Sequence, residues 1–152
     1  MRSHMFLAMI AMVACSTPPV RVQVVARDGS ARLEELLRRY PLAATANIRS
    51  DEIARTAAAS IHLVQVQGKE TPHRHVHHDL AITVLRGQGD LTLDGAKRPL
   101  EAGDVAVIPR GSVHDFARTG ASPAVALVVF APPLDAPDNV PVGNVDSPPV
   151  PR

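Results

Sequence analysis

Between Ile61 and Phe130 the chain consists of short apolar runs that are separated by turn residues. Strands this short and this closely spaced are typical of an antiparallel sandwich or barrel. The pair Asp94-Gly95 is a strong hairpin signal, and no helical pattern alternates with the runs, which argues against a parallel sheet. We therefore predict an all-β fold with strands at Ile61–Val66, Leu80–Leu85, Leu91–Leu93, Val105–Ile108, Val113–Ala117 and Val125–Phe130.

The segment before these strands carries one helical pattern. Apolar side chains recur at Leu33, Leu36, Leu37 and Tyr40, which is the spacing of one helix face. The residues at 28–30 offer a cap and Pro41 ends the pattern, so we predict a helix over 31–40 that packs on the outside of the domain. The residues at 51–59 fit either a strand or a turn. We interpret 31–59 as a helical lead-in to the β domain.

The first residues of the chain predict where the protein is found. Arg2 and the apolar run that ends at Ala14 have the charge and length of a signal peptide, which we place at 1–14. The run is too short to cross a bilayer as a helix. Met12-Val13-Ala14-Cys15 resembles the lipobox of bacterial lipoproteins. That resemblance implies lipid on Cys15, a membrane anchor, and a place in the bacterial cell envelope, facing the periplasm or the cell surface. An ordinary secretory signal with an incidental cysteine is the alternative.

The two flanks of the β domain differ in composition from it. We interpret residues 15–30 as a tether, because the segment Ser16-Thr17-Pro18-Pro19 that follows Cys15 favours an extended chain. Prolines also dominate 132–152, which predicts an extended C-terminal tail. Its nearer part carries Leu134 and Val140 and is expected to pack along the domain.

Composition restricts the kinds of partner. The formal net charge is +1 and the arginines are scattered, so the chain lacks the basic footprint of a nucleic-acid-binding protein. Aromatic residues make up 3% of the chain and there is no Trp, so the core has to come from Val, Ile, Leu and Ala. Cys15 is the single cysteine, which leaves the folded part without an intrachain disulfide.

The histidines are the candidate functional residues. His73 and His75 stand two apart, and side chains two apart on a strand share a face. His114 follows a tight Pro-Arg-Gly turn and offers a third ring from another strand. Three histidines on strands are a divalent-metal site that keeps coordination positions open for water, a substrate or dioxygen.

At this point the chain resembles the cupin superfamily. The first motif of that family is matched in part, by Gly68, His73, His75 and Gly87. The second is matched without a gap, by Gly103, Pro109, Gly111 and His114. The resemblance covers 60–131 and implies a double-stranded β-helix, that is, a jelly-roll barrel, with a metal bound inside.

The chain departs from the family at the glutamate of the first motif. Leu80 stands at the usual position, and Asp79 lies one residue earlier. Asp79 binds the metal only if a bulge turns it inward without turning Leu80 out, so we predict a site of three histidines. His77 lies an even number of residues after His73, so on a strand it would share the face of His73, and it is the candidate to replace the missing glutamate as a ligand. Otherwise His77 and the adjacent histidine at position 78 are solvent-facing loop residues. A barrel that has lost its metal is the alternative for the whole cluster.

The function remains open at this level. An all-nitrogen ligand set favours Zn, Fe, Ni or Cu over Mg and Ca, and Mn is also a candidate. The protein is either a metal-binding envelope cupin of unassigned activity, a metal-dependent oxygenase or isomerase acting on a small organic molecule, or a metal-free module that binds a small ligand. Whether it is an enzyme and whether it forms a homodimer are open. Arg86 and Arg118 are candidates for attracting an anionic ligand to the mouth of the barrel.

Overall fold

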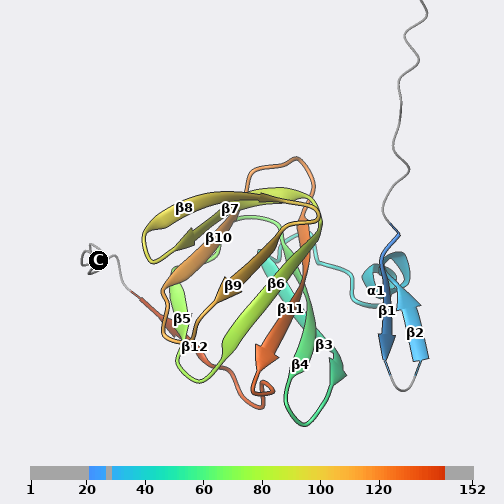
Figure 1. Ribbon diagram of the computed structural model, residues 1–152. Helices are drawn as coiled ribbons and strands as arrows, with labels where there is room; N and C mark the ends of the chain where they lie inside the picture. The colour runs from blue at the N-terminus through green and yellow to red at the C-terminus, as the bar shows by residue number, and fades with distance from the viewer. Residues whose placement is uncertain (1–20, 27–28, 143–152) are drawn as a thin grey trace, which may run out of the picture.

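The computed structural model describes residues 21–26 and 29–142, which form two antiparallel sheets of five strands and an N-terminal unit of one hairpin and one helix (Figure 1). The predicted all-β class with a short helix is confirmed. The first sheet has the spatial order β12 (Asn139–Pro141), β5 (His73–His75), β10 (His114–Arg118), β7 (Gln88–Leu93) and β8 (Ala96–Glu101). The second has the order β3 (Ile48–Arg55), β4 (Ser60–Val66), β11 (Ala124–Ala131), β6 (Asp79–Arg86) and β9 (Val105–Ile108).

Two of these strands lie outside the range 60–131. β3 covers part of the segment that fits a strand or a turn, and it pairs with β4 from Ile48 to Arg55. β12 comes from the proline-rich C-terminal segment and pairs with β5. The hydrogen-bonded sheets therefore extend beyond the predicted barrel on both sides.

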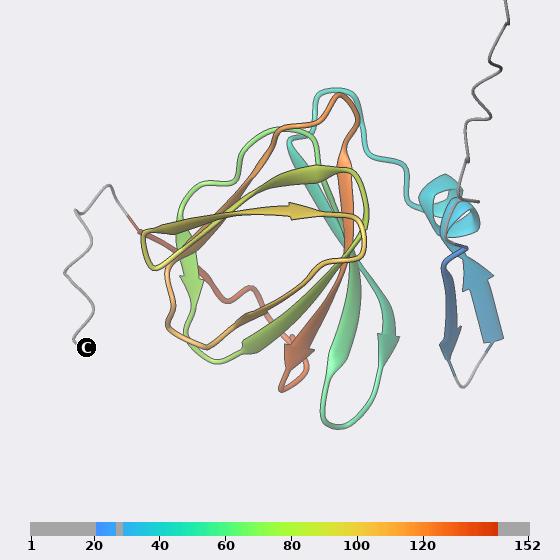
Figure 2. The same cartoon turned by 45° about the horizontal axis from the view of Figure 1, so that its top comes forward.

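The two sheets enclose an apolar interior, and Figure 2 shows their strands surrounding it. In β6 the inward side chains alternate with outward ones, as the period of a strand requires, so Leu80 and Val84 are buried while Ala81 is exposed. The interior cluster consists of Leu80, Leu91, Ile108, Val128 and Phe130.

The N-terminal unit differs in detail from its prediction. Part of the predicted tether forms a hairpin of β1 (Gln23–Ala26) and β2 (Gly29–Arg32), and the helix α1 spans Leu33–Arg39. The prediction of a cap at 28–30 is wrong, because residues 29–32 pair with β1. Instead, Glu35 accepts a hydrogen bond from the backbone N–H of Arg32 at 2.9 Å. The helix ends just before Pro41, as predicted.

α1 packs on the outer face of the second sheet. Leu33 and Leu36 join Leu63 and Val125 in a second buried cluster. Leu63 points away from the barrel interior, since its neighbours His62 and Val64 line the inside, and it is 0% exposed. The helix therefore covers the face of the second sheet that points away from the barrel interior, and it shields the apolar side chains there from water.

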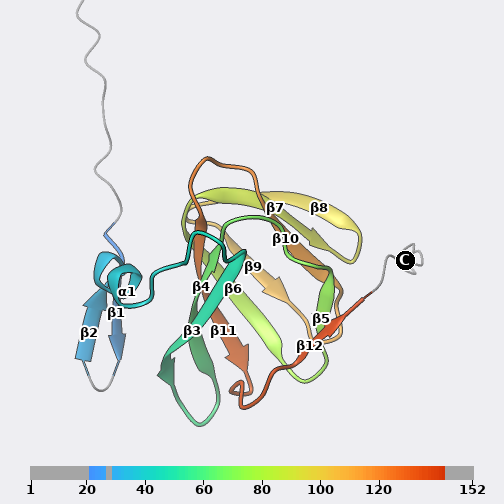
Figure 3. The same cartoon turned by 180° about the vertical axis from the view of Figure 1, so that it is seen from behind.

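The C-terminal segment after β11 crosses from the second sheet to the first (Figure 3). Its start is held by Ser60, whose Oγ accepts a hydrogen bond from the backbone N–H of Leu134 at 2.9 Å, and by Arg55, which contacts Asp135 at 2.6 Å. Leu134 packs against the interior cluster, as expected from the sequence. The tail is thus part of the barrel up to residue 142. The predicted signal peptide, Cys15 and the rest of the tail lie outside the described residues.

Within residues 21–26 and 29–142, no helix is both long and apolar enough to cross a membrane.

Candidate metal centre

His73, His75 and His114 lie on two neighbouring strands of the first sheet. His73 and His75 are alternate residues of β5 and therefore share a face. β10 begins at His114, which is paired directly with His73 across the sheet. All three side chains are buried, with at most 8% of each residue exposed.

The three rings converge, as the spacing of the motifs predicts. The ring centroids are 5.1 Å apart for His73 and His75, 4.3 Å for His73 and His114, and 5.4 Å for His75 and His114. One ring nitrogen from each residue lies within 4.8 Å of the other two. These nitrogens are therefore positioned to bind a single metal ion.

Hydrogen bonds to backbone carbonyls fix the tautomer of two rings. The Nδ1 atom of His73 lies 2.9 Å from the carbonyl oxygen of Thr71, and that of His114 lies 3.1 Å from the carbonyl oxygen of Ser112. A carbonyl oxygen only accepts, so each Nδ1 carries the proton and each Nε2 offers a lone pair. The Nδ1 atom of His75 is buried without a partner among the described residues. A buried nitrogen without a partner and two oriented lone pairs fit a bound metal ion.

The electrostatics of the cluster keep the rings of His75 and His114 neutral. Burial, together with the neighbouring His114 and His73 rings, lowers the pKa of His75 to about 4. Burial and the His73 ring lower the pKa of His114 to about 4. Metal ligation requires neutral imidazole, so both rings are ready to bind a cation at neutral pH without first losing a proton.

Asp79 lies outside the cluster. Its carboxylate accepts hydrogen bonds from the backbone N–H of Arg110 at 2.9 Å and from the Arg110 guanidinium at 2.5 Å. The bond from the Arg110 side chain lowers the pKa of Asp79 to about 2. Leu80 takes the inward position and is 4% exposed. The candidate ligand set in the described residues is thus the three histidines.

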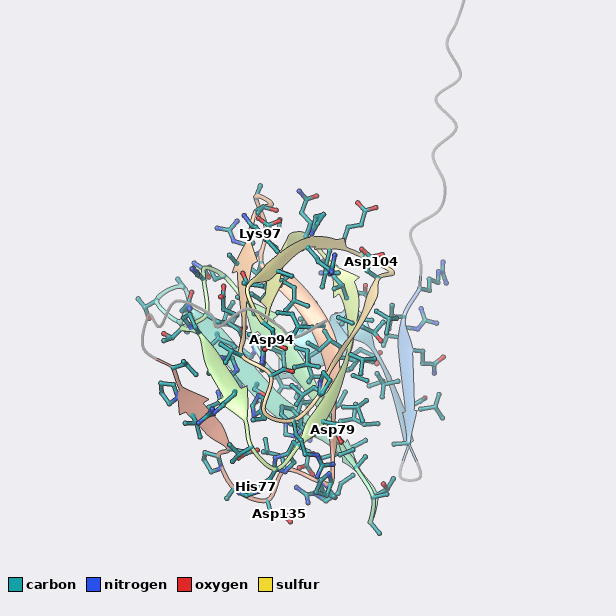
Figure 4. The ribbon with its side chains drawn as sticks, turned by 60° about the vertical axis from the view of Figure 1, so that its left-hand side comes forward. His77, Asp79, Asp94, Lys97, Asp104 and Asp135 are labelled. Carbon is teal, nitrogen blue, oxygen red and sulfur yellow. The ribbon has the colours of Figure 1, made fainter. Side chains whose placement is uncertain are left out.

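His77 is exposed and also lies outside the cluster, at the same end of the barrel as Asp79 and Asp135 (Figure 4). The expectation that His78 faces solvent is wrong. His78 is 6% exposed, and its Nδ1 lies 2.6 Å from the carboxylate of Asp138. The partner comes from the C-terminal segment, so the sequence near His78 gives no sign of it.

The motif glycines and proline position the loop in front of His114. Pro109 and Gly111 form the turn before β10, and Gly111 has a positive φ of 84°, which favours glycine. Its N–H donates to the carbonyl oxygen of His75 at 2.6 Å, which ties the loop to β5. Gly87 and Gly103 stand at the turns after β6 and before β9, on either side of the β7–β8 hairpin.

The cluster opens into a cavity of about 520 Å³ between the sheets. Most of its lining is aliphatic, and Phe130 separates His75 from His62, with ring centroids at 5.4 and 4.9 Å. His62 of β4 is also buried, with its Nε2 3.0 Å from the Ser60 hydroxyl. Glu70 also lines the cavity. The arrangement offers three nitrogen ligands beside a space of ligand size.

The fold and the site together define a small two-sheet β-barrel protein with a candidate metal centre inside the barrel. The sequence of residues 60–130 matches the family described as Cupin domain. This part of the chain belongs to the cupin superfamily, which confirms the resemblance seen in the two motifs.

Similar proteins agree with this assignment. An uncharacterized protein of Aquifex aeolicus is 46% identical over 78 residues, which are 51% of this chain and 64% of that protein, so the match spans less than two thirds of the relative. The structure of KdgF from Halomonas sp. is 27% identical, with a TM-score of 0.55, over 60% of this chain and 84% of that chain. An uncharacterized conserved protein with a double-stranded β-helix domain from Klebsiella pneumoniae is 23% identical, with a TM-score of 0.56, over 63% and 86%. At this identity the last likeness shows the fold alone.

Proposed function

We propose that this protein is a cupin that binds one divalent metal ion through His73, His75 and His114 and holds a small molecule beside that ion. The observation that carries the proposal is the convergence of three buried ring nitrogens within 4.8 Å. The fixed tautomers of His73 and His114 and the unpartnered Nδ1 of His75 support it. A set of three nitrogens favours Zn, Fe, Ni or Cu, with Mn as a further candidate, and leaves positions for a ligand.

Metal analysis tests the proposal. The purified protein is stripped with a chelator, reloaded with each of these metals in turn, and its metal content is measured by mass spectrometry. We expect about one equivalent in the wild type and loss of most of it in His75→Ala, because three-nitrogen ligation cannot spare a ring. His77→Ala is the matched control, since it removes an exposed histidine from the same run and should keep the metal. A wild type that takes up none of these metals would establish the metal-free ligand-binding alternative.

A catalytic role for the ion is the second candidate. An ion held by three protein ligands would keep coordination positions open, and the three histidines line a cavity of about 520 Å³ that has room for a small substrate. When bound, the ion would supply Lewis-acid or oxygen chemistry, while the histidines hold it and the aliphatic lining keeps bulk water out. Oxygen uptake or isomerisation with small organic acids and phenols, lost in His75→Ala and retained in His77→Ala, would support an oxygenase or isomerase.

We also propose that the protein is anchored in the bacterial cell envelope by lipid on Cys15. The proposal rests on the apolar run and the Met12-Val13-Ala14-Cys15 sequence. The prolines that follow Cys15 suit a tether between an anchor and the barrel.

A further inference from the structure

The cavity opens between the edge of the second sheet and the C-terminal segment. β3 is an edge strand, and three of its alternate side chains line the cavity although they are exposed: Ile48, Ser50 and Glu52. Residues 135–137 also line the cavity and are exposed. Arg55 joins the two parts, since it contacts Glu52 and Asp135 at 2.6 Å each. The entrance to the cavity therefore lies between β3 and residues 135–137, whereas the histidine cluster is buried.

His62 lies just inside this entrance. It is paired with Glu52 across β3 and β4, and its ring lines the cavity with 6% of the residue exposed. Phe130 contacts both His62 and His75, with ring-centroid distances of 4.9 and 5.4 Å. A polar group near the entrance and the candidate metal centre are thus one aromatic ring apart within the same cavity.

The His62 ring has one nitrogen in a good hydrogen bond and one without. Its Nε2 lies 3.0 Å from the hydroxyl of Ser60, which also accepts a hydrogen bond from the backbone N–H of Leu134. Its Nδ1 lies 3.5 Å from the hydroxyl of Ser50, which is longer than the usual range for such a bond. Among the described residues, neither the Nδ1 atom nor the Ser50 hydroxyl has a shorter hydrogen bond. A hydroxyl group of a ligand that lies beside both atoms can therefore bond to each of them.

The ring that faces the ligand is neutral. Burial lowers the pKa of His62 more than the nearby carboxylate of Glu52 raises it. A neutral imidazole has one donor and one acceptor nitrogen, and a serine hydroxyl can donate or accept. A hydroxyl group also does both, so it fits either tautomer of His62, whereas an ether or a carbonyl oxygen only accepts.

The basic residues near the barrel are engaged elsewhere. The Arg118 guanidinium donates to the carbonyl oxygens of Gln67 and Gly120, and Arg86 contacts Glu34 at 3.3 Å on the outside of the barrel. Neither lines the cavity, so the structure does not support the expectation that these two arginines attract an anionic ligand. The polar groups that a ligand meets just inside the entrance are uncharged side chains.

We propose that Ser50 and His62 form a second binding subsite, which takes the hydroxyl group of a small apolar alcohol whose body lies against Phe130 and whose other end faces the metal centre. The proposal rests on the function proposed above and deepens it, because it names the class of molecule that binds beside the ion. The aliphatic lining stabilises the apolar body by removing it from water. A hydroxyl group costs free energy when it is buried without partners, and this subsite supplies two of them.

Two probes of one shape test the inference: benzyl alcohol and ethylbenzene, in which a methyl group replaces the hydroxyl. Binding to the metal-stripped protein is measured by NMR titration, so that the ion does not contribute, and the quantity compared is the ratio of the two dissociation constants. Ser50→Ala and His62→Phe each remove part of the subsite, and the phenylalanine keeps a ring against Phe130. We expect each variant to reduce the preference for the alcohol about threefold to tenfold, which is the usual effect of one neutral hydrogen bond.

Ser122→Ala is the matched control, because Ser122 is an exposed serine that does not line the cavity, and it should leave the ratio unchanged. Thermal unfolding shows whether each variant is folded. Ser50 is exposed on an edge strand, so Ser50→Ala decides the question even if His62→Phe does not fold. An unchanged ratio in folded Ser50→Ala, or failure of both probes to bind the wild type, overturns the inference.

A separate metal-uptake measurement on the wild type distinguishes the two proposals. Lost uptake, together with a ratio that falls in Ser50→Ala, refutes the metal centre and leaves the subsite. Intact uptake, together with a ratio that stays the same in Ser50→Ala, refutes the subsite and leaves the metal centre.

Discussion

At the scale of single residues, one position decides the ligand set. Asp79 and Leu80 are neighbours at the start of β6, so they point to opposite faces. Turning Asp79 inward would turn Leu80 out of the interior cluster, and burial of one large aliphatic side chain is worth about 1.5–3 kcal/mol. Arg110 gives the outward carboxylate a partner at the surface. Both effects favour the register that leaves the three histidines without a carboxylate.

Removing the Asp79 carboxylate should therefore spare the metal. We expect Asp79→Ala to keep the metal content of the wild type after stripping and reloading, because the lost partner is Arg110 and not the ion. Even the loss of a residue that only orients a metal ligand typically reduces metal affinity about 10–100-fold. The measurement therefore distinguishes an Asp79 that binds the ion from one that does not. A loss as large as that of His75→Ala would show that Asp79 binds the ion.

The same histidines should make the metal-free protein sensitive to acid. His75 and His114 have pKa values of about 4 in the folded state, whereas an unfolded histidine has a pKa of about 6.5. Between these pH values the unfolded state binds more protons than the folded state. The contribution of the two rings to the free energy of unfolding is therefore fully present above about pH 6.5 and is lost as the pH drops toward 4. Each ring taken alone would contribute on the order of 3 kcal/mol, and the pair less than twice that because its mutual repulsion is shared.

Urea unfolding of the stripped protein between pH 7 and pH 4 measures this effect. His75→Gln should flatten the decline, because it removes one titrating ring and relieves the other. A free energy of unfolding that is constant over this range would contradict the burial of neutral rings.

At the scale of elements, α1 stabilises the barrel from outside the cavity. Leu36 of α1 is 5% exposed and belongs to the cluster with Leu63, on the face of β4 that points away from the histidines. The helix therefore affects the stability of the sheet without touching the candidate metal centre.

Truncating Leu36 should separate stability from binding. We expect Leu36→Ala to lower the free energy of unfolding by about 2–5 kcal/mol, as for other fully buried leucines. Leu37→Ala, at a half-buried position on the same helix, should cost less. Urea unfolding gives both values, and metal content should stay at the wild-type level in each variant that is folded. Metal loss in folded Leu36→Ala would mean that the helix supports the centre after all.

The elements show how far the sequence determines the fold. The predicted strands between Ile61 and Phe130 follow from local alternation and turns, whereas β8, which is rich in charged residues and contains a proline, is not among them. The two motifs are sufficient to place the three histidines. β3 is rich in charged residues, which leaves its local pattern ambiguous, and β12 contains a proline and has no local strand signal. Both are strands because a partner pairs with them. His78 and Asp138 are 60 residues apart, and only the path of the C-terminal segment brings them together.

At the scale of the whole molecule, the barrel and its proposed anchor are separate parts of the chain. The described residues begin at 21, and the barrel strands at Ile48, so the candidate centre is far along the sequence from Cys15. A change at Cys15 should therefore alter location and leave metal binding unchanged.

Replacing the cysteine tests the anchor. We expect Cys15→Ser to abolish lipidation and to move the protein from the membrane fraction to the soluble fraction, with metal content unchanged. Mass spectrometry of the N-terminal peptide detects the lipid, and fractionation gives the location. Ser16→Ala is the neighbouring control and should stay with the membrane. A wild type without lipid, together with a Cys15→Ser protein that stays in the membrane fraction, would establish an ordinary secretory signal.

The position of β5 between β10 and β12 has a consequence for synthesis. A ribosome makes residues 139–141 after every other strand described here, so on a nascent chain the strand with two of the three histidines has an open flank until β12 emerges. The residues that close the flank are preceded by Asp138, which also holds His78. A product that ended early, before residue 132, would carry both sequence motifs and yet lack one wall of the cavity. The cavity is therefore complete only once residues 132–141 have joined the barrel, so a nascent chain that lacks them does not yet present a formed cavity to small molecules.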